Sequence, residues 1–127
     1  MKTANAPRLA GFTLVEIMIV VAIIGLLAAI AIPNFIKSRA TSQADACIEN
    51  MSKIDYGINE WALENNQPSG VAAPALSILV SSNYLRTPGG NVPQCPAGGT
   101  YSLLTVGSTP SVTCSLSTTV YPSHVLR

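Results

Sequence analysis

The chain opens with a short polar segment and then carries almost no charge over a long apolar run. From Phe12 to Ile32 there are 21 residues, and Glu16 is the only charged one. A helix rises about 1.5 Å per residue, so this run would cover about 30 Å, which is the thickness of a bilayer's hydrocarbon core. The pattern therefore predicts a membrane-spanning helix, although Glu16 is a costly residue inside one.

A cleaved secretory signal peptide is the ordinary alternative for such a start. The run is longer than the apolar region of a typical signal peptide, which has about 7–15 residues. The stretch "LLAAIAIP" is only a weak imitation of a cleavage site of the A-x-A kind, and it passes directly into a helical pattern. These features favour a retained anchor.

Beyond Pro33 the apolar positions recur in alternating steps of four and three residues, which is typical of one stripe on an amphipathic helix. The pattern ends at the Asn-, Pro- and Gly-containing stretch 65–70, so we expect one helix of about 50 residues. Pro33 should kink it, and Gly25 is a second weak point. The stripe lacks the Leu and Ile seam of a coiled coil, so we expect it to pack on its own chain. It comprises Ala40, Ala44, Cys47, Met51, Ile54, Ile58 and Trp61.

The C-terminal half alternates short apolar segments with turns. Residues 73–85 are expected to form a short helix, and residues 100–106 and 111–117 a β-hairpin around the turn "GSTP". Residues 91–95 are a candidate for one more strand. The expected fold class is α+β, with a long N-terminal helix packed against a small antiparallel hairpin or meander lobe. The expected parts are a leader (1–11), a transmembrane helix (12–33), an amphipathic helix (34–66) and a C-terminal lobe (67–127).

Charge is distributed unevenly along the chain. The net charge is +1, and all six acidic residues precede residue 65. Only Arg86 and Arg127 are charged after that point. Nothing here suggests a surface for nucleic acid, and the lobe has no carboxylate for acid–base chemistry. We therefore expect no enzyme active site.

The three cysteines are odd in number, so one thiol must stay unpaired within a monomer. We expect one disulfide if the lobe lies outside the cytoplasm. Cys95 and Cys114 both lie in the lobe and are the preferred pair, while Cys47 is an alternative partner for either. The spacings match no zinc motif, so no metal site and no cofactor are expected. His124 has no acid or nucleophile motif near it and is expected to be a surface or packing residue.

The stretch "GFTLVEIMIVVAIIGLLAAIAIP" from Gly11 to Pro33 resembles the N-terminal signature of the type IV pilin and type II secretion pseudopilin superfamily, a prepilin-type methylation motif. The match comprises Gly11, Phe12, Glu16 five positions after the glycine, and an apolar run containing Gly25 and Pro33. The stretches "ACIENMSKID", "EWALENN" and "CPAGGTY" are similar, more weakly, to short cysteine-containing pseudopilin-like proteins.

The resemblance implies how the chain would be processed. Prepilin peptidase, a membrane aspartyl peptidase, would cut between Gly11 and Phe12 on the cytoplasmic side and methylate the new amine of Phe12. Lys2 and Arg8 of the leader would hold that end in the cytoplasm. Glu16 would then meet the N-terminus of the preceding subunit in a helical filament, whereas the alternative is a helix-end carboxylate that snorkels to the membrane interface.

The resemblance also implies location and partners. The chain would wait in the inner membrane as a single-pass protein with its lobe outside the cytoplasm, in contact with lipid and with an assembly platform. It would then polymerise with copies of itself into a periplasmic pseudopilus or an extracellular pilus, and Gly25 and Pro33 would mark where the packed helix loses hydrogen bonds. Because no carboxylate follows Glu64, the acidic calcium site of major pseudopilins is not expected here.

The sequence leaves open which of the two filaments the chain builds. A different class is a minor pilin or pseudopilin that acts as a binding or DNA-uptake module. Two arginines in the lobe support DNA binding only weakly, so no nucleic-acid partner is expected.

Overall fold

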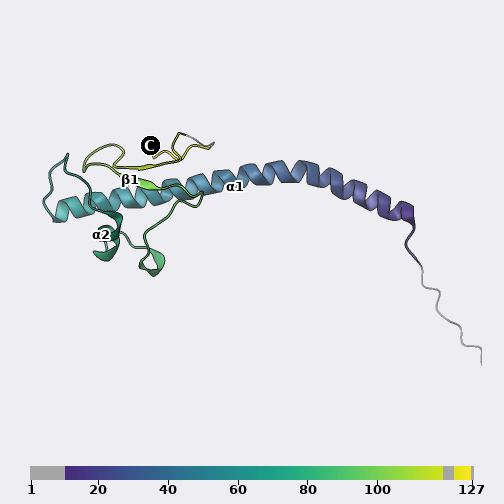
Figure 1. Ribbon diagram of the computed structural model, residues 1–127, viewed down its shortest axis with the longest axis horizontal. Helices are drawn as coiled ribbons and strands as arrows, with labels where there is room; N and C mark the ends of the chain where they lie inside the picture. The colour runs from purple at the N-terminus through teal and green to yellow at the C-terminus, as the bar shows by residue number, and fades with distance from the viewer. Residues whose placement is uncertain (1–10, 119–121, 127) are drawn as a thin grey trace, which may run out of the picture. The chain divides into compact units, whose positions relative to one another are not determined.

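The computed structural model describes residues 11–118 and 122–126, so the predicted roles of Lys2, Arg8 and Arg127 fall outside the described residues. The chain forms two compact units, with the boundary between Ile36 and Lys37. Within the described residues its elements are two α-helices, a short 3-10 helix and two strands, drawn in Figure 1. They are α1 (Leu14–Glu64), α2 (Leu76–Ser81), η1 (Pro88–Gly90), β1 (Tyr101–Leu103) and β2 (Val112–Cys114).

The N-terminal unit contains the first part of α1. The helix as a whole has 51 residues, which confirms the predicted length, and it is helical at Pro33. Its apolar stretch is long and apolar enough to cross a membrane. From Gly11 to Arg39 every residue is exposed except Ala28, which is half-buried. From Gly11 onward this unit therefore has no core of its own and presents an apolar surface.

In the second unit α1 buries the predicted stripe. The residues from Ala44 to Ile58 on that stripe are at most 1% exposed. Ala40 and Trp61 at its two ends are only half-buried, and Gly57 and Ala62 are buried beside it. The stripe is thus confirmed in its middle, and it is shorter than expected at both ends.

Gly57 allows a close approach in the middle of this helix. A Cβ atom at that position would lie 3.0 Å from the backbone oxygen of Tyr84. That separation is tighter than ordinary van der Waals contact, so a side chain would push the segment after α2 away from α1. The cost of glycine inside a helix, about 1 kcal/mol relative to alanine, is offset here by packing.

The helix expected over 73–85 is real but much shorter, at Leu76–Ser81. Residues before it pair with the hairpin instead, since the N–H of Ala73 donates to the oxygen of Leu104 at 3.0 Å. The helix ends where Asn83 adopts a positive φ of 61°, a left-handed conformation that is common just after helices. Leu79 is its buried residue.

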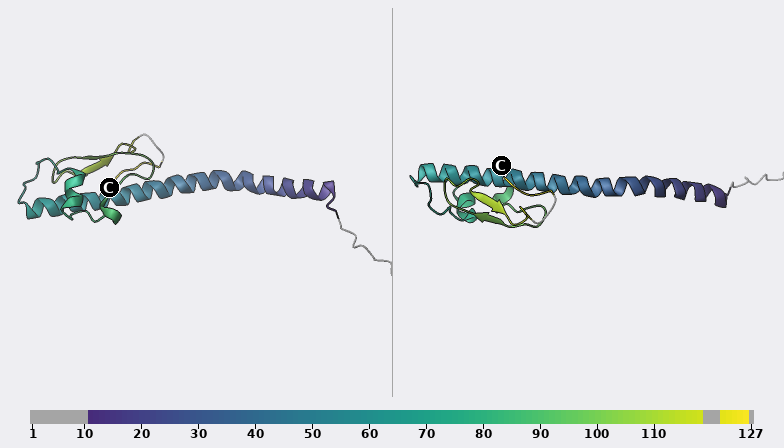
Figure 2. Two further views of the ribbon diagram at one scale, coloured as in Figure 1. Left: turned by 60° about the horizontal axis from the view of Figure 1, so that its bottom comes forward. Right: turned by 90° about the horizontal axis from the view of Figure 1, so that it is seen from above.

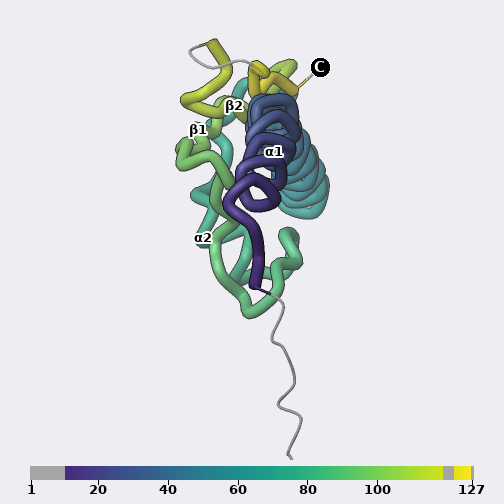
Figure 3. The backbone as a smooth tube through the Cα atoms, turned by 90° about the vertical axis from the view of Figure 1, so that its right-hand side faces the viewer, coloured from purple at the N-terminus to yellow at the C-terminus, as the bar shows by residue number. Residues whose placement is uncertain are grey.

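The predicted hairpin is confirmed. β1 and β2 pair antiparallel, with Tyr101 opposite Cys114 and Leu103 opposite Val112. Figures 1 and 2 show β1 and β2 running beside the second half of α1, and Figure 3 shows the hairpin and α2 on one side of that helix. The strand expected at 91–95 is wrong: the segment is irregular, and Pro93 has no N–H to offer a strand ladder.

The hairpin and α1 share one core. The buried cluster joins residues of the helix stripe to residues of α2, the loops and β2. Its members are Cys47, Met51, Ile54, Ile58, Ala62, Leu79, Leu85, Cys95, Val106, Val112 and Cys114. The expectation that the stripe packs on the chain's own C-terminal lobe is confirmed, and so is the α+β fold class.

Candidate functional site

The first candidate site lies at the start of α1. Thr13 directly precedes the helix, and its Oγ1 accepts a hydrogen bond from the N–H of Glu16 at 3.2 Å. This is the N-cap half of a capping box, in which a threonine is followed three residues later by glutamate. Gly11 and Phe12 lie just outside the helix, and the Phe12 side chain is 77% exposed. The helix therefore starts immediately after the predicted cleavage point.

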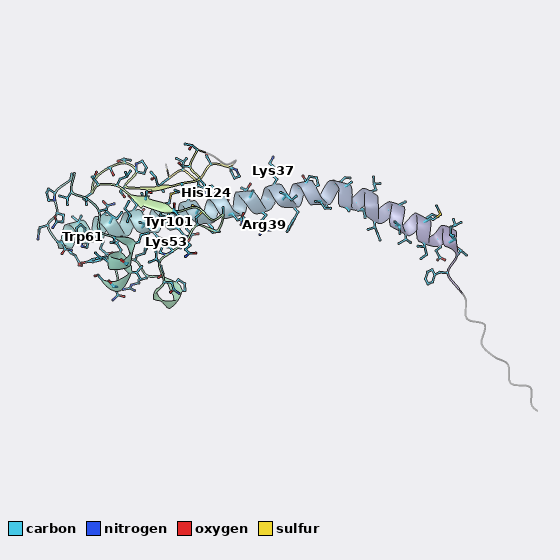
Figure 4. The ribbon with its side chains drawn as sticks, viewed as in Figure 1. Lys37, Arg39, Lys53, Trp61, Tyr101 and His124 are labelled. Carbon is cyan, nitrogen blue, oxygen red and sulfur yellow. The ribbon has the colours of Figure 1, made fainter. Side chains whose placement is uncertain are left out.

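Glu16 is the third residue of the helix, where the unpaired backbone N–H groups give a partial positive charge. Its side chain is exposed. Within the described residues an ion pair forms between the Lys53 Nζ atom and the Glu49 Oε1 atom, 2.7 Å apart. No ion pair among these residues involves Glu16. The basic side chains nearest to it along the described chain are Lys37 and Arg39, which Figure 4 shows further along α1. A carboxylate in this position can form an ion pair with a cation that another group supplies.

A second cluster lies inside the C-terminal unit. One ligand-type atom each from Cys47, Cys95, Cys114 and His124 lies within 4.8 Å of every other. All four residues are buried, with exposed fractions from 0% to 5%. They come from four separate segments: α1, the irregular loop, β2 and the C-terminal segment. Figure 4 places His124 and Tyr101 beside the same stretch of α1.

Contacts within this cluster are close. The Sγ atom of Cys95 and the Nδ1 atom of His124 are 3.4 Å apart. The three cysteines are free thiols in this structure. The predicted disulfide of Cys95 with Cys114, or of either with Cys47, stays a prediction.

The surroundings of Cys47 and Cys95 shift the pKa values of their thiols in opposite directions. Burial raises the pKa of Cys47 to about 12. Burial also acts to raise the pKa of Cys95, but the backbone N–H groups of Ala97 and Gly99 and the neighbouring thiols outweigh it, so that its pKa falls below the usual value. Burial, followed by the contact with Cys47, raises the pKa of Tyr101 above its usual range. The Cys95 thiol therefore has a lower pKa than the Cys47 thiol.

Sequence reasoning missed His124 as a member of this cluster. It is 2% exposed and contacts sulfur, so of the two expected alternatives, a surface or a packing residue, the structure shows the packing one. The spacing of the cysteines gives no zinc motif because each comes from a different segment. The one available signal was compositional: an odd cysteine count beside the only histidine of the chain.

Comparison with known proteins places the N-terminal segment in a known sequence motif. A family model described as "Prokaryotic N-terminal methylation motif" matches residues 8–32, which include Gly11, Phe12 and Glu16. Type II secretion system core protein G of Pectobacterium carotovorum subsp. carotovorum is 30% identical over 112 residues. That match covers 79% of this chain and 69% of the relative. The chain belongs to the superfamily of type IV pilins and type II secretion pseudopilins.

Two type IV major pilins match this chain over a shorter stretch than protein G does. Type IV major pilin protein PilA of Myxococcus xanthus is 60% identical over 66 residues, which are 52% of this chain and 30% of that protein. Type IV major pilin protein PilE1 of Neisseria gonorrhoeae is 40% identical over 73 residues, 54% of this chain and 34% of that protein. The chain thus spans only about a third of the length of these two major pilins. No solved structure matches significantly.

Proposed function

We propose that this chain is the precursor of a structural subunit in a helical filament of the pilus or pseudopilus type, assembled from the inner membrane. The observation that carries the proposal is the bare apolar helix, which begins directly after Gly11 and Phe12 and holds Glu16 in its first turn. A helix of this kind can lie in lipid before assembly and pack against copies of itself afterwards.

Processing would create a partner for Glu16. Hydrolysis between Gly11 and Phe12 adds water across the peptide bond and leaves an amine on Phe12. A methyl group from a methyl donor would then replace one hydrogen of that amine, which stays cationic. A cation is unfavourable at the N-terminus of a helix because the helix dipole is positive there. A carboxylate four residues further on compensates for it.

The same pairing can set the register of a filament. A charged side chain at the centre of a membrane helix costs about 2.5–3.5 kcal/mol on insertion scales. An incoming subunit that places Glu16 beside the Phe12 amine of its neighbour removes two unpaired charges at once. A shifted subunit leaves both unpaired in an apolar core, so that a single position is favoured.

The proposal assigns one role to each part of the chain. Residues 1–11 are the leader, residues 12–33 the membrane anchor and later filament core, residues 34–66 the amphipathic helix, and residues 67–127 the outer lobe. Gly25 and Pro33 are the proposed places where the helix opens in the filament, because the carbonyl of Ala29 has no N–H partner at Pro33.

The coverage of the relatives favours a pseudopilin over a type IV pilin. The matches to type II secretion protein G extend over 76–79% of this chain and thus into its lobe. The matches to the two major pilins cover only 52% and 54% of the chain. A role as a DNA-uptake module is not favoured, because Arg86 is the one basic residue in the described lobe after residue 65.

The mature N-terminus tests this proposal. Filaments sheared from cells, and a periplasmic fraction from the same cells, should contain a chain that begins at Phe12 and carries one methyl group by mass spectrometry. A Gly11→Val variant should keep its leader and stay in the membrane, while Gly25→Val, a matched glycine change in the same helix, should still be cleaved. A mature chain that begins near Ala31 would instead show a cleaved signal peptide and refute the proposal.

A further inference from the structure

The cluster of three thiols and one imidazole has a use that the filament proposal does not include. We infer that Cys47, Cys95, Cys114 and His124 form a structural zinc site that ties the lobe to α1. The inference is independent of the filament function, since it rests on four buried side chains of the C-terminal unit and involves none of the residues before Lys37.

The geometry suits a tetrahedral ion. With metal–sulfur bonds of about 2.3 Å and metal–nitrogen bonds of about 2.0 Å, tetrahedral ligand atoms lie about 3.5–3.8 Å from one another. The Cys95 Sγ atom and the His124 Nδ1 atom are already 3.4 Å apart, and no pair among the four exceeds 4.8 Å. Small side-chain rotations would close the remaining distances. The set of three sulfurs and one nitrogen is a known structural zinc set.

The burial of the four residues indicates a structural zinc site and not a catalytic one. A catalytic zinc keeps an open coordination position for water, whereas a structural zinc is closed by four protein ligands. All four residues are at most 5% exposed, and their donor atoms face one another in the interior of the lobe. Three thiolates also favour zinc over calcium or magnesium, which prefer oxygen.

Neighbouring groups are arranged to support thiolates. The turn "CPAGG" that carries Cys95 is closed by a hydrogen bond from the N–H of Gly98 to the backbone oxygen of Cys95 at 2.9 Å, which fixes the backbone of this ligand. The Tyr101 hydroxyl lies close to Cys47 but is buried without a hydrogen-bond partner in the described part of the chain. A zinc ion with three thiolates and a neutral imidazole carries one net negative charge, and the Tyr101 hydroxyl is a donor suited to stabilise it.

Gly99 shows how closely the backbone approaches this cluster. A Cβ atom there would lie only 2.7 Å from the Cys114 sulfur. The absence of a side chain therefore lets the loop close over the Cys114 sulfur atom.

Zinc uses the whole cluster, whereas a disulfide does not. Binding breaks three S–H bonds, releases three protons and forms three Zn–S bonds and one Zn–N bond, with no oxidant needed. A disulfide between any two of the cysteines requires a two-electron oxidant and leaves the third thiol and His124 buried without a role. The odd cysteine count is thereby explained.

The full chain provides the test. It is purified in detergent with a tag free of histidine and cysteine, and zinc is measured by plasma mass spectrometry together with titratable thiols. We expect one tightly bound zinc per chain and three free thiols after denaturation and metal removal. A strong chelator should lower the melting temperature by at least about 10 °C, and added zinc should restore it. Cobalt substitution should give the absorption of a tetrahedral thiolate site.

Variants separate the ligand role from simple damage to the core. His124→Ala should lose the zinc, and His124→Cys should keep it with four sulfur ligands. Leu79→Ala is the matched control, because Leu79 is fully buried but contributes no ligand; it should lower the melting temperature and keep the zinc. Metal-free protein with two cysteines joined in a disulfide would overturn the inference, and so would zinc content that His124→Ala leaves unchanged.

Discussion

Under the proposed function, Glu16 is the residue whose surroundings would change most between the precursor and the mature chain. In the precursor it follows the N-cap Thr13, and its carboxylate has no cationic partner among the described residues. After cleavage at Gly11 every copy of the chain would carry a new positive charge at Phe12. Under the proposed function, the same side chain would pass from a helix-end carboxylate to half of an ion pair.

Replacement of Glu16 tests this role. Glu16→Ala should be processed and bound to the membrane as before, because neither step needs its charge. The yield of sheared filaments should fall at least about tenfold, since an unpaired amine in an apolar core costs more than the 1.4 kcal/mol that corresponds to that factor. Quantitative blotting of sheared and membrane fractions measures both.

Thr13→Ala is the matched control for that experiment. It removes the N-cap and keeps the charge, so its filament yield should stay close to that of the unchanged chain. A normal filament yield for Glu16→Ala, or equal losses in the two variants, would reduce Glu16 to a helix-capping residue.

At this scale the sequence was informative where function depends on neighbours in the chain. Gly11, Phe12 and Glu16 lie within one short segment, so their pattern is visible without a structure, whereas the role of Thr13 as N-cap emerged only from its hydrogen bond with Glu16. His124 and the three cysteines are far apart in the chain, and only the fold brings them together. No spacing rule can show such a site, because loop lengths between the ligands are not fixed by the metal.

The end of α1 is held by the segment that follows α2. The Tyr84 hydroxyl donates a hydrogen bond to a carboxylate oxygen of Glu64 at 2.6 Å, and the Asn65 side chain lies 3.4 Å from the same hydroxyl. The hydrogen bond to Glu64, with burial second, raises the pKa of Tyr84 above its ordinary value. The contact therefore connects two elements through a group that titrates in alkali.

The sign of the pH effect follows from that shift. A tyrosine whose pKa is higher in the folded chain stabilises the fold below the pKa of the unfolded chain, near 10, and the stabilisation is lost as the pH rises through the folded pKa. The melting temperature of the unchanged chain should exceed that of Tyr84→Phe at pH 8, and the difference should vanish in strong alkali. Circular dichroism between pH 8 and 11 measures this.

Tyr56→Phe serves as the control for the tyrosine experiment, because Tyr56 is 73% exposed on α1, the helix that carries Glu64. It should show no such pH-dependent difference. Other groups that titrate in alkali, including the thiols and Tyr101, are common to all three proteins and cancel in the comparison. If the difference in melting temperature between Tyr84→Phe and the unchanged chain stayed constant with pH, the hydrogen bond between Tyr84 and Glu64 would be ruled out as its source.

Elements were predictable in proportion to their periodicity. The long helix and the hairpin have regular patterns and were confirmed. The segment 73–85 has apolar residues at helical spacing, yet its first part pairs with the hairpin, as the Ala73 to Leu104 hydrogen bond shows. Local pattern cannot decide such a competition, because the pairing partner lies about 30 residues further along the chain.

At the scale of the whole molecule, apolar surface and buried core belong to different parts of the sequence. Most of the large exposed apolar side chains lie between Phe12 and Ile36. The core cluster and its packed neighbours lie between Cys47 and Leu126. This separation is what a subunit needs if it must be held in lipid, fold outside it and later be extracted.

Truncation tests whether the two parts are independent. A chain of residues 37–127 keeps every member of the core cluster and loses the apolar stretch, so it should be a detergent-free monomer by light scattering. Its melting temperature should match that of the C-terminal unit in the longer chain, within about 4 °C, because a loss of 1 kcal/mol would shift a domain of this size by about that much. A chain of residues 12–127 is the matched control and should need detergent. Aggregation of the short chain, or loss of its helical and tyrosine circular dichroism signals, would mean that the lobe depends on the apolar helix for its fold.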